Sequence, residues 1–189
     1  TLYGSDAVAG VINIITKKGK GKPRFNISSE GGTHRTFKET VSFSGSENKA
    51  DFSLEESWFT TRGISAAKEG TEKDGYQNNL LSSRLGYKIF DNAELNFILR
   101  RTYSKTDLDD AAFTDDPNYT GWYRDLVTKL EFKQNLCPWF NYKLSANYFG
   151  VKRKYKDEEP GASDSQSWYK GDNRKFELQQ NIIPNDWNT

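Results

Sequence analysis

The sequence predicts an all-β protein in which antiparallel strands form the wall of a transmembrane β-barrel. Apolar and polar side chains alternate over many segments of about ten residues, as in strands with two different faces. Short and long connections follow one another in turn along the chain. Aromatic residues make up 14% of the 189 residues. The mean hydropathy is only −0.87, as expected where polar lumen-facing residues alternate with lipid-facing ones.

Composition excludes several other classes of protein. No apolar run approaches the roughly 20 residues that a spanning helix needs, so a helical membrane protein is excluded. The formal net charge is +1, which gives no global signature of nucleic-acid binding. The chain contains no methionine, even at its start. We therefore expect it to be a piece of a longer polypeptide.

The opening stretch, "TLYGSDAVAGVINIITKKG", predicts a buried strand before the wall begins. Its apolar residues occupy both faces of the strand, which is typical of a strand covered on both sides. They are Val8, Val11, Ile12, Ile14 and Ile15. The Gly- and Lys-rich residues 17–23 follow and predict an exposed linker.

Eight amphipathic strands are predicted after this linker. The clearest alternation runs over residues 50–58, 93–104 and 140–148, where Leu54, Leu99 and Leu144 lie among apolar residues of one parity. Weaker alternation predicts the other five strands. They contain Phe25 and Ile27; Phe37, Val41 and Phe43; Leu81 to Ile89; Leu126 to Phe132; and Phe176 to Ile182.

The predicted connections alternate in length. "GSENK", "FDNA" and "LCPW" are short, whereas residues 61–77, 106–121 and 156–173 form long connections. Only "GGTHR" is short where a long loop is expected. Short turns on one side and long loops on the other are typical of outer-membrane barrels, with the loops extracellular. Aromatic girdles are then expected toward the outer ends of the strands (Trp58, Tyr103, Tyr148) and toward the inner ends (Tyr87, Phe140).

The segment "YGSDAVAGVINIITKKG", followed by amphipathic strands, resembles the end of the plug and the start of the barrel in TonB-dependent outer-membrane receptors. Within that family, "DGYQNNLLSSRLGY" and the general layout are most similar to the vitamin B12 transporter and colicin I receptor branch. The resemblance implies a 22-stranded barrel occluded by a plug. Residues 1–18 would be the end of the plug, 19–24 the linker, and 25–189 the first part of the wall.

This resemblance implies a receptor and transporter in the bacterial outer membrane. A scarce nutrient, such as cobalamin or a ferric siderophore, would bind at the extracellular loops and the plug. The TonB complex would supply the energy for import, through a coupling segment expected upstream of this chain. The sequence itself does not distinguish among possible nutrients.

The second long connection is acidic and predicts a possible calcium site. Five aspartates lie within ten residues: Asp107, Asp109, Asp110, Asp115 and Asp116. Hard oxygen ligands at this density suit calcium, and the cobalamin branch of the family is similar in using loop aspartates in this way. A solvated loop without a metal ion is the alternative, because the spacing lacks the register of an EF-hand.

Two further groups of residues are candidates for binding. Aromatic residues assigned to the long loops suit a large, partly apolar ligand, although the upper aromatic girdle and packing between loops explain them equally well. They are Tyr119, Trp122, Tyr123, Trp168 and Tyr169. Lys152, Lys154 and Lys156 share the parity of Tyr148 and are expected to meet the phosphates of lipopolysaccharide. A solvated strand end is the alternative for these lysines.

Catalytic patterns are weak in this sequence. His34 is the only histidine and Cys137 the only cysteine, and neither belongs to a zinc-ligand or nucleotide motif. We therefore expect no enzyme. Two other classes stay open at this point: a complete eight-stranded barrel with an adhesive or structural role, and a soluble β-sheet module.

Overall fold

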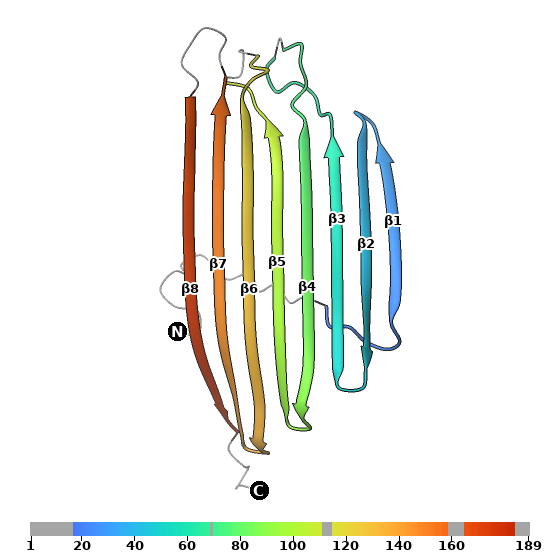
Figure 1. The fold of residues 1–189 in the computed structure, drawn as a ribbon, viewed down its shortest axis with the longest axis vertical. Coiled ribbons are helices and arrows are strands. Elements are labelled where there is room, and N and C mark those ends of the chain that lie inside the picture. Colours follow the sequence, from blue (N-terminus) through green and yellow to red (C-terminus); the bar gives the residue numbers. More distant parts are fainter. Residues whose placement is uncertain (1–16, 69, 111–114, 159–164, 184–189) are drawn as a thin grey trace, which may run out of the picture.

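The computed structural model describes residues 17–68, 70–110, 115–158 and 165–183. The strands form one antiparallel sheet in which each strand pairs with the next along the chain (Figure 1). The all-β prediction is confirmed. The strands are β1 (Arg24–Gly32), β2 (Thr36–Glu47), β3 (Ala50–Thr61), β4 (Tyr76–Phe90), β5 (Ala93–Asp107), β6 (Thr120–Cys137), β7 (Phe140–Asp157) and β8 (Ser165–Ile182). No helix among the described residues has the length and apolar character needed to cross a membrane.

The pairing register divides the side chains between two faces, because directly paired residues point to the same side of a sheet. One row of pairs joins Phe43, Leu54, Ser83, Leu99, Thr128 and Tyr148. We call their side the apolar face. The next row along the strands, which includes Ser42, Glu55 and Arg100, belongs to the polar face. The predicted parity is therefore confirmed across neighbouring strands.

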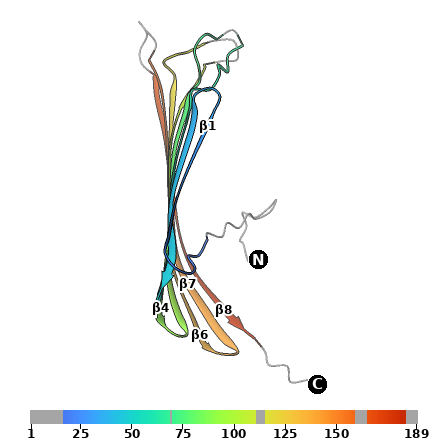
Figure 2. The ribbon, with the colours of Figure 1, turned by 90° about the vertical axis from the view of Figure 1, so that its right-hand side faces the viewer.

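Burial on this sheet is the reverse of that in a water-soluble core. The buried polar residues of the described chain all lie on the polar face: Asp51, Asn96, Ser104, Asp125, Glu131 and Ser145. Large side chains of the apolar face are exposed, and Phe176 reaches 83%. Among the described residues, Ala67 and Ala93 are the only buried hydrophobic ones. The sheet is a single layer in side view (Figure 2), so no other described part of the chain covers the apolar face.

The short connections agree with the prediction. Residues 48–49, 91–92 and 138–139 form two-residue turns at one edge of the sheet. The opposite edge carries the connections 33–35, 62–75, 108–119 and 158–164. The tight first connection places His34 and Arg35 in the left-handed region, each with φ of 55°.

One predicted loop was too long. The connection expected over 156–173 spans only residues 158–164, because β8 already begins at Ser165. Residues 165–173 are polar on both faces, with Lys170 on one face and Asn173 on the other. Hydropathy alternation therefore could not reveal this half of β8.

The lower turns are staggered across the sheet. They close at the pairs Glu47↔Ala50, Phe90↔Ala93 and Cys137↔Phe140. When the pairing is followed across the sheet, each closing pair lies two residues lower than the preceding closing pair. Successive turns are two strands apart, so the offset is one residue per strand. Figure 1 shows the same descent from the β2–β3 turn to the β6–β7 turn. With a rise of about 3.3 Å per residue and strands about 4.8 Å apart, this offset corresponds to a tilt of roughly 35°.

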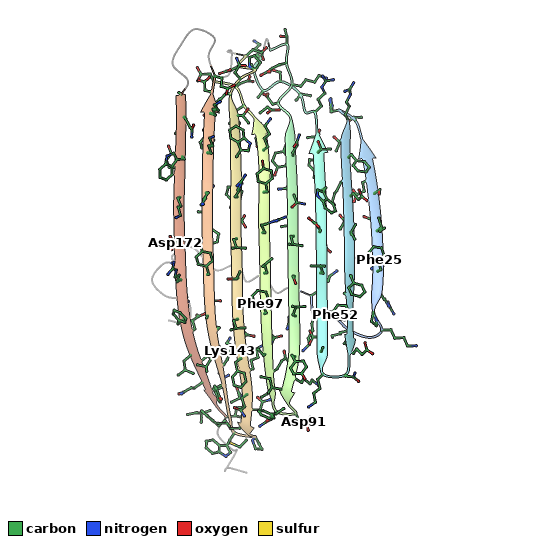
Figure 3. All side chains as sticks on the ribbon, in the orientation of Figure 1. Phe25, Phe52, Asp91, Phe97, Lys143 and Asp172 are labelled. Carbon is green, nitrogen blue, oxygen red and sulfur yellow. The ribbon has the colours of Figure 1, made fainter. Side chains whose placement is uncertain are left out.

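The exposed apolar side chains also lie lower on each successive strand, as the turns do. The row of pairs that begins with Phe25 and Phe43 ends at Arg174 on β8. On β8 the apolar residues Phe176, Leu178 and Ile182 lie below that row. In Figure 3, Phe25 on β1 and Asp172 on β8 accordingly lie at similar heights.

The linker before β1 contacts the polar face. The Nζ atom of Lys18 lies 3.2 Å from Oδ2 of Asp51 and 3.0 Å from Oε2 of Glu94. Both carboxylates belong to that face. Gly19 lies directly against the backbone of β2 and β3, where an added Cβ would be 2.0 Å from the carbonyl oxygen of Phe52. Lys18 and Gly19 therefore lie against the sheet, with the Lys18 ammonium on its polar side.

Two further predictions concern the buried first strand and Ile89. The predicted buried strand with Val8, Val11, Ile12, Ile14 and Ile15 lies outside the described residues. Ile89, taken as part of an alternating series, breaks that series in the structure. The register shifts between Lys88 and Phe90, so Phe90 pairs with Ala93. A bulge of this kind inserts one extra residue and ends the alternation.

Candidate functional site

Two long loops meet above the sheet, at the edge opposite the short turns. They are the β3–β4 loop (62–75) and the β5–β6 loop (108–119). Because strands β4 and β5 are antiparallel neighbours, the loop that enters β4 and the loop that leaves β5 lie at the same edge. Figure 1 shows both loops at the upper end of the sheet.

Hydrogen bonds from backbone amides hold the two loops together. The amide of Ala67 donates to Oδ2 of Asp109 at 2.6 Å. The amides of Thr71 and Glu72 donate to Oδ2 of Asp115 at 2.8 Å and 3.3 Å. An added Cβ on Gly70 would lie 2.4 Å from Oδ1 of Asp115, so this carboxylate lies directly against the backbone of the other loop. Two aspartates of one loop thus order the backbone of the other.

Three carboxylates converge at this junction. One oxygen from each of Glu72, Asp109 and Asp115 lies within 4.8 Å of the other two. Within the described chain, Oε1 of Glu72 and Oδ1 of Asp115 are buried without a hydrogen-bond partner. Burial, followed by the charges of Asp115 and Asp74, raises the pKa of Glu72. The amides of Thr71 and Glu72 lower the pKa of Asp115.

These residues fit a calcium ion. Calcium prefers hard oxygen ligands and accepts carboxylates in irregular arrangements. A divalent cation would neutralise the like charges and take up the two unpartnered oxygens. Glu72, Asp109 and Asp115 would be the protein ligands.

The five predicted aspartates are not all brought together. Asp109 and Asp115 belong to the converging group, whereas Asp107 forms an ion pair with Lys105 at 3.3 Å. Asp116 accepts a hydrogen bond from the amide of Asn118 at 3.0 Å. Asp110 lies outside the converging group and is exposed. Of the five candidate ligands, the structure brings Asp109 and Asp115 together, and calcium binding stays a prediction.

Sequence reasoning missed Glu72 and its neighbour Asp74. Burial raises the pKa of Asp74, and Asp109 adds to this effect. Both residues precede the aspartate run by more than thirty positions. The usable signal was topological, because the sequence already predicted that both long loops lie at one edge. An acidic residue in either loop was therefore a candidate ligand.

The predicted loop aromatics were misplaced. Trp122 and Tyr123 belong to β6, and Trp168 and Tyr169 belong to β8. Only Tyr119 lies in a loop. The two tryptophans lie in one row of the apolar face, joined through Lys154. The two tyrosines lie in a row of the polar face, joined through Arg153.

Tyrosines gather at the upper end of the polar face. The ring centroid of Tyr155 lies 6.3 Å from that of Tyr119 and 6.4 Å from that of Tyr169. The guanidinium of Arg153 lies 5.4 Å from the ring centroid of Tyr123. A pocket of about 190 Å³ beside these rings is lined by residues that include Tyr123, Arg153 and Tyr155. We call these five residues the tyrosine cluster; it offers ring faces and hydroxyl groups to a partly polar ligand.

The predicted lysine series lies on the apolar face, as expected from its parity. Lys152, Lys154 and Lys156 occupy successive outward positions above Tyr148 on β7. Arg153 and Tyr155 point to the polar face. His34 and Cys137 lie in or beside connections at opposite edges of the sheet. Their positions add no catalytic constellation to the site.

No protein-family model matches the chain, and a search of curated proteins finds no relative.

Proposed function

We propose that this chain forms the first part of the barrel wall of a TonB-dependent outer-membrane receptor. The observation that carries the proposal is the reversed burial of the two faces: buried polar residues on one side and exposed large apolar residues on the other. Such a sheet suits hydrocarbon on its apolar side and an occupied polar interior on the other. In water, an apolar surface of this extent favours aggregation, which disfavours a soluble module.

The stagger of the sheet supports a tilted membrane wall. A tilt of roughly 35°, derived from the register, falls at the lower end of the range for outer-membrane strands. On β7, the apolar series from Phe140 to Tyr148 covers nine residues. This is the length expected for a tilted transmembrane strand. Among the described strands, β1 pairs only with β2 and β8 only with β7, which favours a larger barrel over a closed eight-stranded one.

The linker supports an interior plug. Lys18 contacts Asp51 and Glu94 on the polar face, so the preceding residues would enter the barrel lumen. This arrangement agrees with the resemblance of "GVINIITK" to a final plug strand. The nutrient, of the cobalamin or ferric siderophore class, would bind where the calcium-ordered loops and the tyrosine cluster meet the plug. The TonB complex would then drive import.

Adjacent spin labels test the membrane position. Labels at Leu54, Leu99 and Leu144, in the full-length polypeptide in lipid vesicles, are expected to contact oxygen dissolved in the acyl region. Labels one residue away, at Ser53, Arg100 and Lys143, are expected to contact a water-soluble relaxation agent instead. Exposure of all six labels to bulk water would overturn the proposal.

Nutrient uptake tests the receptor role separately. Cells that lack the gene are expected to grow poorly on limiting cobalamin or on one ferric siderophore, and the intact gene is expected to restore growth. Restoration should require active TonB. Equal growth without the gene, on every nutrient of these classes, contradicts the import function and leaves the membrane position intact.

A further inference from the structure

Three cations lie side by side on the apolar face, near its upper end. Arg124 on β6 pairs with Lys152 on β7, which pairs in turn with Lys170 on β8. All three residues are exposed. Like charges directly opposite each other on neighbouring strands destabilise a sheet. The row therefore has a cost that an anionic ligand would relieve.

No carboxylate of the described chain forms an ion pair with these three cations. Asp172 is the next residue of the same face below Lys170 on β8, but it forms an ion pair with Arg174 at 3.8 Å. The guanidinium of Arg124 lies 5.0 Å from the ring centroid of Tyr103. This contact leaves the donors at the edge of the guanidinium free for an anion.

Aromatic rings border the cation row on its upper side. Lys154 pairs with Trp122 and Trp168, one on each side. Its Nζ atom lies 5.4 Å from the ring centroid of Trp122. A groove of about 510 Å³ is lined by residues of both rows, including the two tryptophans. Tryptophan is enriched where a membrane protein meets lipid headgroups.

An apolar groove adjoins the row on its lower side. It has a volume of about 720 Å³, and its lining includes Leu126, Tyr148 and Gly150 together with the three cations. An added Cβ on Gly150 would lie 2.5 Å from the hydroxyl oxygen of Tyr148. The tyrosine ring therefore lies along the bare backbone, with its hydroxyl toward the cations. The surface combines a cationic rim with a floor that suits an acyl chain.

The cation row also lies at the height of phosphate groups in the proposed membrane. Lys152 is twelve residues above Phe140 on β7. At about 3.3 Å per residue and a tilt of roughly 35°, this separation spans about 32 Å along the membrane normal. The apolar band of an outer-membrane barrel is about 25 Å tall. Lys152 is thus about 7 Å beyond hydrocarbon, within the headgroup layer.

We propose that Arg124, Lys152 and Lys170 bind the phosphates of an anionic glycolipid, the lipid portion of lipopolysaccharide. One acyl chain lies along Leu126 and Tyr148. Arginine presents paired donors to a phosphate, and the lysines add point charges. Three adjacent cations match a headgroup with more than one phosphate better than a zwitterionic phospholipid. This inference rests on the membrane position proposed above and extends the series Lys152, Lys154, Lys156 to a site across three strands.

The test measures binding of lipid A to the full-length protein in nanodiscs of zwitterionic phospholipid. The variant Arg124→Gln/Lys152→Gln/Lys170→Gln removes the row. The matched control, Lys22→Gln/Lys49→Gln/Lys88→Gln, removes the same charge near the lower edge. Each cation near an anionic surface contributes roughly a fivefold change in affinity, so the first variant is expected to bind about 100-fold more weakly. The control is expected to bind within about twofold of the parent protein.

Further outcomes decide the chemistry. The variant Lys152→Arg/Lys170→Arg keeps the charge, and its retention of binding supports phosphate recognition. Equal affinity of the triple variant, or equal binding of dephosphorylated lipid A, overturns the inference. If inorganic phosphate, which has no acyl chains, binds as tightly as lipid A, the ligand of this site is not a lipid. Undisturbed nutrient uptake and a lipid-exposed label at Leu144, together with no lipid A binding, would reject this inference alone.

Discussion

The two faces of the sheet differ in how their side chains find partners, although they share one backbone. On the polar face, buried groups are matched to one another: Glu131 forms ion pairs with Lys129 at 2.7 Å and Lys133 at 2.8 Å. On the apolar face, rings lie side by side, as Phe43 and Phe52 do at 4.8 Å. Glu131 on the polar face therefore finds its partners within the sheet, whereas the large exposed side chains of the apolar face depend on their surroundings. The difference teaches that the large apolar side chains of one face need a covering that the described strands do not supply.

The largest expected effect comes from a charge placed on the wrong face. Phe43→Arg puts a guanidinium near the middle of the apolar band and is expected to cost about 2–4 kcal/mol of folding free energy in a bilayer. The matched variant, Ser42→Arg, points to the polar face, where Glu55 is its paired neighbour. It is expected to cost less than about 1 kcal/mol. Urea titration of the full-length protein in vesicles measures both, and equal costs would contradict the assignment of the faces.

A smaller effect is expected where the linker meets the polar face. Lys18→Met leaves Asp51 and Glu94 without their cation and is expected to weaken the contact by about 1–2 kcal/mol. The side chain of Lys18 is 33% exposed, so solvent screening limits the effect. Hydrogen exchange of the Ser46 amide, which donates to the carbonyl of Gly21 at 2.7 Å, reports local opening. Lys18→Arg keeps the charge and should keep the protection; equal exchange in both variants counts against a role for the ion pairs.

The contrast between faces also explains what the sequence could predict. Alternation located β5 and β7 because their apolar residues share one parity, and the paired turn residues marked the lower edge. The upper half of β8 stayed hidden because Lys170 and Asn173 place polar groups on both faces. The convergence of Glu72 with Asp115 depends on how two loops pack, which no local pattern encodes. Residues in loops and at the upper strand ends therefore need the fold, whereas residues in the regularly alternating strand segments do not.

The loop junction extends the comparison to a third region, where Oε1 of Glu72 and Oδ1 of Asp115 lack a hydrogen-bond partner among the described residues. Asp115→Asn removes one ligand charge and is expected to weaken calcium binding by about tenfold, or 1.4 kcal/mol. Asp110→Asn, in the same loop, changes the net charge equally and is expected to have less than a twofold effect. Calorimetry of the full-length protein with calcium measures both. Equal affinities in the two variants would show that the junction is not the binding site.

The smallest expected effect concerns how the stability of the two loops at this junction depends on pH. Calcium is expected to reverse the sign of that dependence. The pKa of Glu72 is raised above its ordinary value of 4.5, so without calcium the protonated form favours the folded loops. That stabilisation is complete below the ordinary pKa and is lost as pH rises through the raised value. Calcium requires the ionised carboxylate, so its binding reverses the slope and weakens as pH falls toward the raised pKa of Glu72. Protease resistance of the loops, followed against pH with and without calcium, should give slopes of opposite sign. Glu72→Gln should flatten both slopes, because glutamine carries no titrating proton. If the two slopes in the parent protein have the same sign, Glu72 is not a ligand of the calcium ion.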